Sequence, residues 1–131
     1  MLIDTSGFFS INDRAEKHND RAQELYKTAQ VILTTNYILA EYVAIALVRG
    51  LPRKRVVEFS EEVLEDASVE IVWVNEELHR RGVELLRHRP DKTYSLCDAV
   101  SFVLMREGGE TEALTTDRHF EQEGLVRLRA P

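Results

Sequence analysis

The stretch VILTTNYILAEYVAIALVRG, residues 31–50, has the pattern of a strand that leads directly into a helix. The run VIL at 31–33 is apolar and mostly β-branched, which is typical of a buried strand. Either Thr35 or Asn36 can cap the following helix, and the glycine that closes the stretch fits the end of that helix. The stretch therefore predicts one β–α unit.

The same alternation continues on both sides of this unit. Further strands are predicted at residues 2–3, 69–74, 112–115 and 125–128, the last of them at an edge of the sheet. Further helices are predicted at residues 15–29, 52–67, 76–87, 95–106 and 117–123, from the helical spacing of their apolar residues. Residues 4–7 are predicted to form a polar turn. Strands joined by helical crossovers predict an α/β fold with a mostly parallel sheet, covered by helices on both faces.

The composition is that of one folded, acidic domain. The chain has 131 residues, which suits a single domain spanning residues 1–131. Hydrophobic residues make up 44% and charged residues 31%, so we expect a folded core rather than disorder. Acidic residues outnumber Lys and Arg by 23 to 17, which counts against passive binding of nucleic acid. Such acidity is compatible with nucleic-acid chemistry if several acids surround divalent metal ions, which reverse the local charge.

Three features bear on the cellular location. Cys97 is the only cysteine, so no disulfide can form within the chain, which suits a reducing cytosol. The opening residues MLIDTSGFF have no basic segment before the apolar ones, so we expect no secretory signal. No apolar run approaches the ~18 residues that span a bilayer. We therefore expect a cytoplasmic protein without a membrane segment.

Two acidic residues follow predicted strands. Asp4 comes directly after the strand at 2–3, and Asp117 comes after the strand at 112–115. Open α/β sheets bind ligands beyond the carboxyl ends of their strands, so both side chains are candidates for a functional site. Each also has an ordinary structural interpretation, because Asp4 can cap the polar turn and Asp117 can cap a helix.

Two further acids lie inside unusually apolar helices. Glu41 stands in the segment YILAEYVAIALV, and Asp98 stands in SLCDAVSFVLM. A buried ionised carboxylate must be paired with a cation, protonated or bound to a metal ion. Ion pairs with arginine are one alternative for both residues. The four acids together favour a metal site, and carboxylate oxygens suit hard cations such as Mg²⁺ and Mn²⁺.

Four short motifs resemble those of a known family. They are LIDTS at 2–6, LAE at 39–41, SLCDA at 95–99 and LTTDRHF at 114–120. In this order, over nearly the whole chain, they are similar to the PIN-domain family and most closely to its VapC-like toxins. The resemblance implies a three-layer α/β/α sandwich around a parallel sheet, Mg²⁺ or Mn²⁺ as cofactor, and ribonuclease activity.

The resemblance also implies roles for single residues. Its acidic positions correspond to Asp4, Glu41, Asp98 and Asp117. Its hydroxyl positions near the metal correspond to Thr115 and to either Thr5 or Ser6. We expect the first three acids to hold one or two ions and Asp117 to complete the site. A water activated by the cation would then attack an RNA phosphodiester.

The VapC-like resemblance implies the toxin of a type II toxin–antitoxin pair. We therefore expect an RNA substrate, a small antitoxin that blocks the acidic mouth, and a homodimer. The alternative is a non-catalytic PIN-like module that binds RNA or protein. A hydrolase of another α/β type is disfavoured, since the sequence has neither a Gly-x-Ser-x-Gly elbow nor a Walker-type phosphate loop.

Other reactive side chains are interpreted as structural. The four histidines are scattered and form no zinc motif: His18, His79, His88 and His119. Of these, only His119 is a candidate for touching substrate. Cys97 has no histidine near it in the sequence and lies in an apolar helix, which indicates a buried thiol rather than a nucleophile.

Overall fold

The structure is a computed structural model, and it describes residues 1–128. Within this range the chain forms five strands and seven helices. Their order is β1 (Leu2–Ile3), α1 (Thr5–Asn12), α2 (Asn19–Thr28), β2 (Ile32–Thr35), α3 (Asn36–Val48), α4 (Arg53–Glu65), β3 (Val69–Val72), α5 (Glu76–Arg87), α6 (Leu96–Gly108), β4 (Glu112–Leu114), α7 (His119–Gln122) and β5 (Val126–Leu128).

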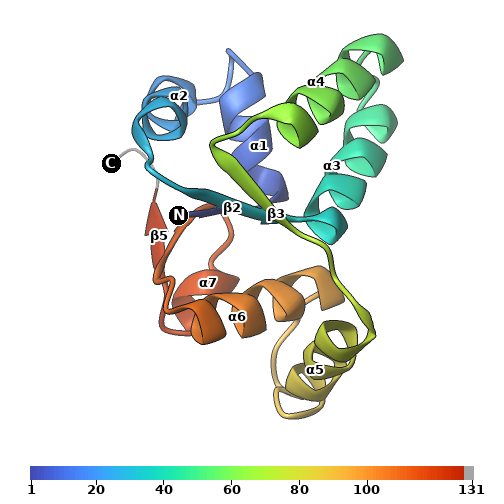
Figure 1. The fold of residues 1–131 in the computed structure, drawn as a ribbon, viewed down its shortest axis with the longest axis vertical. Helices are drawn as coiled ribbons and strands as arrows, with labels where there is room; N and C mark the ends of the chain where they lie inside the picture. Colours follow the sequence, from blue (N-terminus) through green and yellow to red (C-terminus); the bar gives the residue numbers. More distant parts are fainter. Residues whose placement is uncertain (129–131) are drawn as a thin grey trace.

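The strands form one parallel sheet in the order β3-β2-β1-β4-β5. The first strand is central, since Leu2 is in register with Leu33 of β2 on one side and with Ala113 of β4 on the other. Figure 1 shows α1 to α4 on one side of the sheet, and α6 and α7 on the other with α5 beside α6. The predicted three-layer α/β fold is confirmed, and β5 lies at an edge as predicted.

The core occupies both faces of the sheet. Leu2 and Ile3 of β1 are completely buried. Aromatic side chains pack against one another on each side, mostly edge to face: Phe8, Tyr42 and Phe59 form one group, and Tyr94, Phe102 and Phe120 form the other. Burying each large apolar side chain stabilises the fold by about 1.5–3 kcal/mol. The central strand is therefore anchored firmly, and it fixes the position of the residue that follows it.

The predicted polar turn at residues 4–7 is wrong, because these residues begin a helix. Asp4 is the N-cap of α1, and its Oδ1 accepts a hydrogen bond of 2.9 Å from the backbone N–H of Gly7. The helix has only eight residues and five of them are small or polar, so it lacks a clear apolar period. The Asp-Thr-Ser-Gly segment is compatible with a turn as well as with a capped helix start.

Several predicted boundaries also move. The helix predicted at 15–29 begins only at Asn19, and the strand predicted at 31–33 lies at Ile32–Thr35. The sequence left Thr35 and Asn36 open as the N-cap of α3, and the structure shows that it is Thr35. The last helix is only four residues long and begins at His119, so Asp117 is not its N-cap. Caps and short apolar runs tolerate shifts of this size, because tertiary packing decides where hydrogen bonding stops.

None of the helices between residues 1 and 128 combines the length and the apolar character that crossing a membrane requires.

Candidate active site

A pocket of about 170 Å³ lies beyond the carboxyl ends of β1 and β4, where these central strands meet the helices α1, α3 and α6. Its lining residues are Asp4, Thr5, Ser6, Phe9, Glu41, Ile45, Arg49, Cys97, Asp98, Ser101 and Asp117. All four acids expected at a metal site line this one pocket, although they are spread over more than a hundred residues of sequence.

Asp4 is the most deeply buried of the four acids. It is 8% exposed, and its two carboxylate oxygens accept three hydrogen bonds. Oδ1 accepts from the Ser6 hydroxyl at 2.8 Å and from the Gly7 backbone at 2.9 Å, while Oδ2 accepts from the Thr115 hydroxyl at 2.6 Å. Burial raises the pKa of Asp4 to about 6, the hydrogen bonds partly oppose this rise, and the nearby Asp98 adds to it.

The hydroxyl groups form a network that joins the ends of β1 and β4. The Oγ atoms of Ser6 and Thr115 lie 3.1 Å apart. Thr115 Oγ1 also accepts from the backbone N–H of Asp117 at 2.9 Å, and Ser6 Oγ accepts from the backbone N–H of Thr116 at 2.9 Å. The network therefore sets the path of the loop that carries Asp117.

Glu41 projects from the middle of α3 and is held by the neighbouring helix. The Thr5 hydroxyl, at the start of α1, donates a hydrogen bond of 2.5 Å to Glu41 Oε1. Thr5 and Ser6 were alternatives for one hydroxyl position, and both lie at the site with different partners, since Thr5 contacts Glu41 whereas Ser6 contacts Asp4. Each orients one carboxylate toward the shared pocket.

Asp98 lies in the first turn of α6 and takes part in a capping box. The Ser95 hydroxyl accepts from the Asp98 backbone at 3.0 Å, and Asp98 Oδ2 accepts from the Ser95 backbone at 3.1 Å. Among residues 1–128 its other oxygen, Oδ1, has no hydrogen-bond partner. The cap fixes the side chain while leaving one oxygen available to a ligand.

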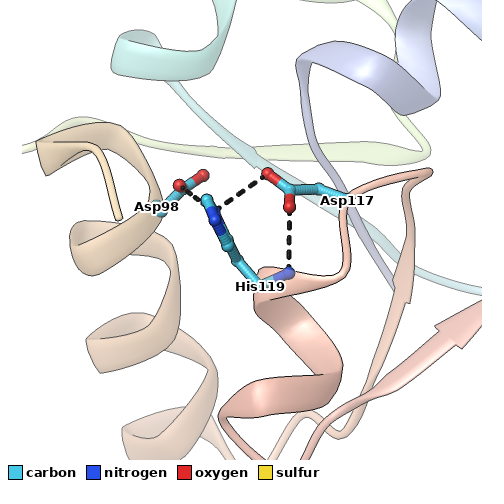
Figure 2. A group of neighbouring side chains, drawn as sticks. All are labelled: Asp98, Asp117 and His119. Atoms are coloured by element: carbon cyan, nitrogen blue, oxygen red, sulfur yellow. Dashed lines mark hydrogen bonds and ion pairs between the residues drawn. The ribbon is translucent and has the colours of Figure 1, made fainter. Parts of the chain in front are cut away.

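His119 lies between two of the acids, as Figure 2 shows. Its Nδ1 is 3.0 Å from Asp98 Oδ2 and 3.3 Å from Asp117 Oδ2, and its Nε2 is 3.0 Å from the Thr93 hydroxyl. The ligand atoms of Asp98, Asp117 and His119 all lie within 4.8 Å of one another. From the sequence, His119 was predicted only as a possible contact to substrate. Its position two residues after Asp117 could have placed it near the acids, since Asp117 Oδ1 accepts the His119 backbone N–H at 2.9 Å.

Arginine and lysine do not neutralise this cluster. In the part of the chain that the structure describes, none of the four acids forms an ion pair with either residue type. The alternative of buried arginine pairs for Glu41 and Asp98 is therefore wrong. Four clustered carboxylates without an arginine or lysine partner offer a set of oxygen donors, which fits a hard divalent cation.

Cys97 also lines the pocket, but its thiol is not activated. Burial raises its pKa, and the negative charges of Glu41, Asp98 and Asp4 raise it further. A thiol is nucleophilic as the thiolate, which this surrounding disfavours. The geometry thus agrees with an inert thiol at this position.

Comparisons with known proteins agree with the fold and the site. The sequence model of the PIN domain matches residues 1–124. Two curated relatives, both named 23S rRNA-specific endonuclease VapC20, come from Mycobacterium tuberculosis strains CDC 1551 / Oshkosh and ATCC 25618 / H37Rv. Each is 25% identical over 130 residues, or 98% of either chain. The crystal structure of M. tuberculosis VapC20, described as a sarcin–ricin loop cleaving toxin, superimposes with a TM-score of 0.88 at 25% identity, over 98% of both chains.

Proposed function

The chain belongs to the PIN domain family, and from this premise we propose that it is a Mg²⁺- or Mn²⁺-dependent endoribonuclease that acts as the toxin of a toxin–antitoxin pair. One observation carries the proposal. Asp4, Glu41, Asp98 and Asp117 line a single pocket, and no arginine or lysine within residues 1–128 pairs with them. The relatives of similar length that cleave 23S rRNA support RNA as the substrate.

The four acids would hold the cation, directly or through water. A bound divalent ion supplies Lewis-acid activation of water and neutralises charge on the phosphate. The donor set fits such an ion on two counts. Asp4 is buried without a positive partner, and Asp98 keeps one oxygen free of hydrogen bonds to the described residues. Without a cation, the carboxylates would repel one another and the RNA backbone.

The remaining polar residues would keep the carboxylates in place. Thr115 and Ser6 hold both oxygens of Asp4, and Thr5 holds one oxygen of Glu41. His119 would orient Asp98 and Asp117 relative to each other, since its Nδ1 faces both. Partners of this kind fix ligand geometry and tune metal affinity. We include Thr115 among the catalytic residues in this sense.

The non-catalytic alternative has less support. Keeping Asp4 buried opposes its ionisation, as its raised pKa shows. A module that only binds RNA or protein gains nothing from gathering acids at such a cost. We further propose that the whole chain acts as a single nuclease domain in the cytoplasm, that it forms a homodimer, and that a small antitoxin covers the acidic mouth.

Cleavage of a defined RNA tests the proposal. The substrate is an end-labelled RNA hairpin with the sarcin–ricin loop sequence of 23S rRNA, incubated with Mg²⁺, with Mn²⁺ or with EDTA. We expect cleavage with either metal and none with EDTA. Asp98→Asn should remove at least about 99% of the activity, because a ligand charge is lost. The variant should stay folded, since asparagine preserves the cap.

The controls separate catalysis from folding and from contaminating nucleases. Circular dichroism should show the same helix content for the wild type and Asp98→Asn. Asp20→Asn, at an exposed position on α2 outside the pocket, should cleave like the wild type. Wild-type rates for Asp98→Asn in the presence of metal would overturn the mechanism.

Growth measurements test the toxin assignment separately. Induced expression of the wild type should arrest bacterial growth, and expression of Asp98→Asn should not. Continued growth at a confirmed level of soluble wild-type protein would contradict the toxin role, while the nuclease assay stands independently.

A further inference from the structure

One face of α3 carries more than Glu41. Ile45 and Arg49 follow it at intervals of four residues, so all three lie along the same stripe of the helix. All three line the acidic pocket. Arg49 is the C-cap residue of α3, and it is the pocket's single basic side chain among the residues described.

Arg49 is held against an aromatic ring from another helix. Its guanidinium carbon lies 4.2 Å from the ring centroid of Phe9 in α1. Phe9 is itself packed against the buried Tyr42, with ring centroids 4.8 Å apart. A guanidinium over an aromatic face is attracted to the ring's quadrupole, so the side chain is oriented before any ligand binds.

Arg49 is also free of an acidic partner. Among residues 1–128 it forms no ion pair, although four carboxylates line the same pocket. Other arginines behave differently, since Arg89 and Arg106 both pair with Glu123. Arg49 therefore lies on Phe9 at the mouth of the pocket, and its N–H groups are not engaged in ion pairs with the four acids.

We propose that Arg49, oriented by Phe9, binds a backbone phosphate of the RNA next to the one that is cleaved. The inference rests on the proposed nuclease function and adds a binding site for the substrate backbone. Glu41 and Arg49 are eight positions apart, so their Cα atoms are ~12 Å apart along the helix axis. Since Arg49 pairs with none of the acids that would surround the reacting phosphate, its guanidinium serves a neighbouring phosphate, and its planar fork suits phosphate oxygens. An acidic protein needs such a local cation to capture RNA.

The first test uses steady-state cleavage of the sarcin–ricin hairpin. Arg49→Met keeps the apolar stem and removes the charge, so KM should rise roughly tenfold while kcat changes little. Arg49→Lys should recover part of the loss because it keeps the charge. Arg87→Met, at the exposed end of α5 outside the pocket, is the matched control and should leave KM unchanged.

The second test measures binding without cleavage. A short fluorescein-labelled single-stranded RNA is titrated with Asp98→Asn protein over a series of KCl concentrations. Adding Arg49→Met should lower the slope of log K against log salt by about 0.7, the value for one lost phosphate contact on a single strand. Phe9→Leu should weaken binding by a smaller factor, because Arg49 keeps its charge but loses its orientation.

The outcomes separate the two proposals. No cleavage by the wild type with either metal overturns the proposed function before Arg49 is tested. A wild type that cleaves, with Arg49→Met unchanged in KM and in salt slope, overturns the inference alone.

Discussion

The hydroxyl of Thr115 donates a hydrogen bond of 2.6 Å to Oδ2 of Asp4, across 111 positions of sequence. The contact exists because β1 and β4 are adjacent parallel strands, with Ile3 in register with Leu114, so the residues that follow them meet at one edge of the sheet. It is buried, and it joins the first and last motifs of the site. The stability and the chemistry of this edge are therefore coupled.

Replacing Asp4 should reveal the cost of burying it. Its pKa is raised from 3.8 to about 6, so the folded state holds the proton more firmly than the unfolded state. The resulting penalty is absent below pH 3.8, grows between pH 3.8 and about 6, and is complete above that range. Asp4→Asn removes it, and should stabilise the metal-free protein at pH 8 by up to roughly 3 kcal/mol.

Urea unfolding in EDTA, at pH 4 and pH 8, checks this expectation. The difference in unfolding free energy between Asp4→Asn and the wild type should be small at pH 4 and favour the variant at pH 8. Asp20→Asn, at an exposed position of α2, should show no such gain. A difference that stays the same at the two pH values would contradict the raised pKa of Asp4.

Metal should stabilise the folded protein. A cation that binds only the native state at about a hundred times its Kd adds ~2.7 kcal/mol, so Tm should rise by roughly 5–10 °C with Mn²⁺. The measurement is differential scanning fluorimetry with and without Mn²⁺, followed by reversal with EDTA. Asp98→Asn should lose most of the shift and Asp20→Asn should keep it. An equal shift in all three proteins would point to binding elsewhere.

Catalysis should depend on the hydroxyl group of Thr115 rather than on the volume of its side chain. It donates to Asp4 and accepts from the Asp117 backbone, so it positions two of the acids. Thr115→Val is nearly isosteric and should lower kcat about 10- to 100-fold, whereas Thr115→Ser should retain most activity. Cleavage assays with saturating metal measure both. Equal activity of the Val and Ser variants would show that the hydrogen bonds are dispensable.

Gly7 should tolerate no side chain. A Cβ there would lie 2.1 Å from the carbonyl oxygen of Leu114 and 3.0 Å from Ile3 Cγ2. Alanine normally favours a helix interior by ~1 kcal/mol over glycine, but the clash should make Gly7→Ala destabilising by more than about 2 kcal/mol.

Gly108→Ala is the matched control for this substitution. Gly108 is also helical, and nothing lies within 4 Å of its added Cβ. This variant should be neutral or slightly stabilised in urea unfolding. Similar stabilities for the two alanine variants would contradict the close approach of α1 to β4.

The family and the architecture could be predicted from local sequence. The β–α alternation needs only short apolar runs and helical periods, and the resemblance of the four motifs to the PIN-domain family is confirmed by the match over residues 1–124. The carboxylates in apolar helices, Glu41 and Asp98, could also be singled out from the sequence, because a buried charge is costly unless it has a partner. Their catalytic role stays a prediction.

Other features depended on contacts between distant segments. Helix α1 was not predicted because it has only eight residues, five of them small or polar, which give too weak a helical period. The sequence indicated no role for Arg49 and only a possible substrate contact for His119, because their neighbours Phe9 and Asp98 lie far from them in the chain. Local sequence determines which backbone states are favourable and which side chains resist burial. Only the packing of strands and helices decides which of those side chains meet, because hydrogen bonds and charge interactions act over a few ångströms.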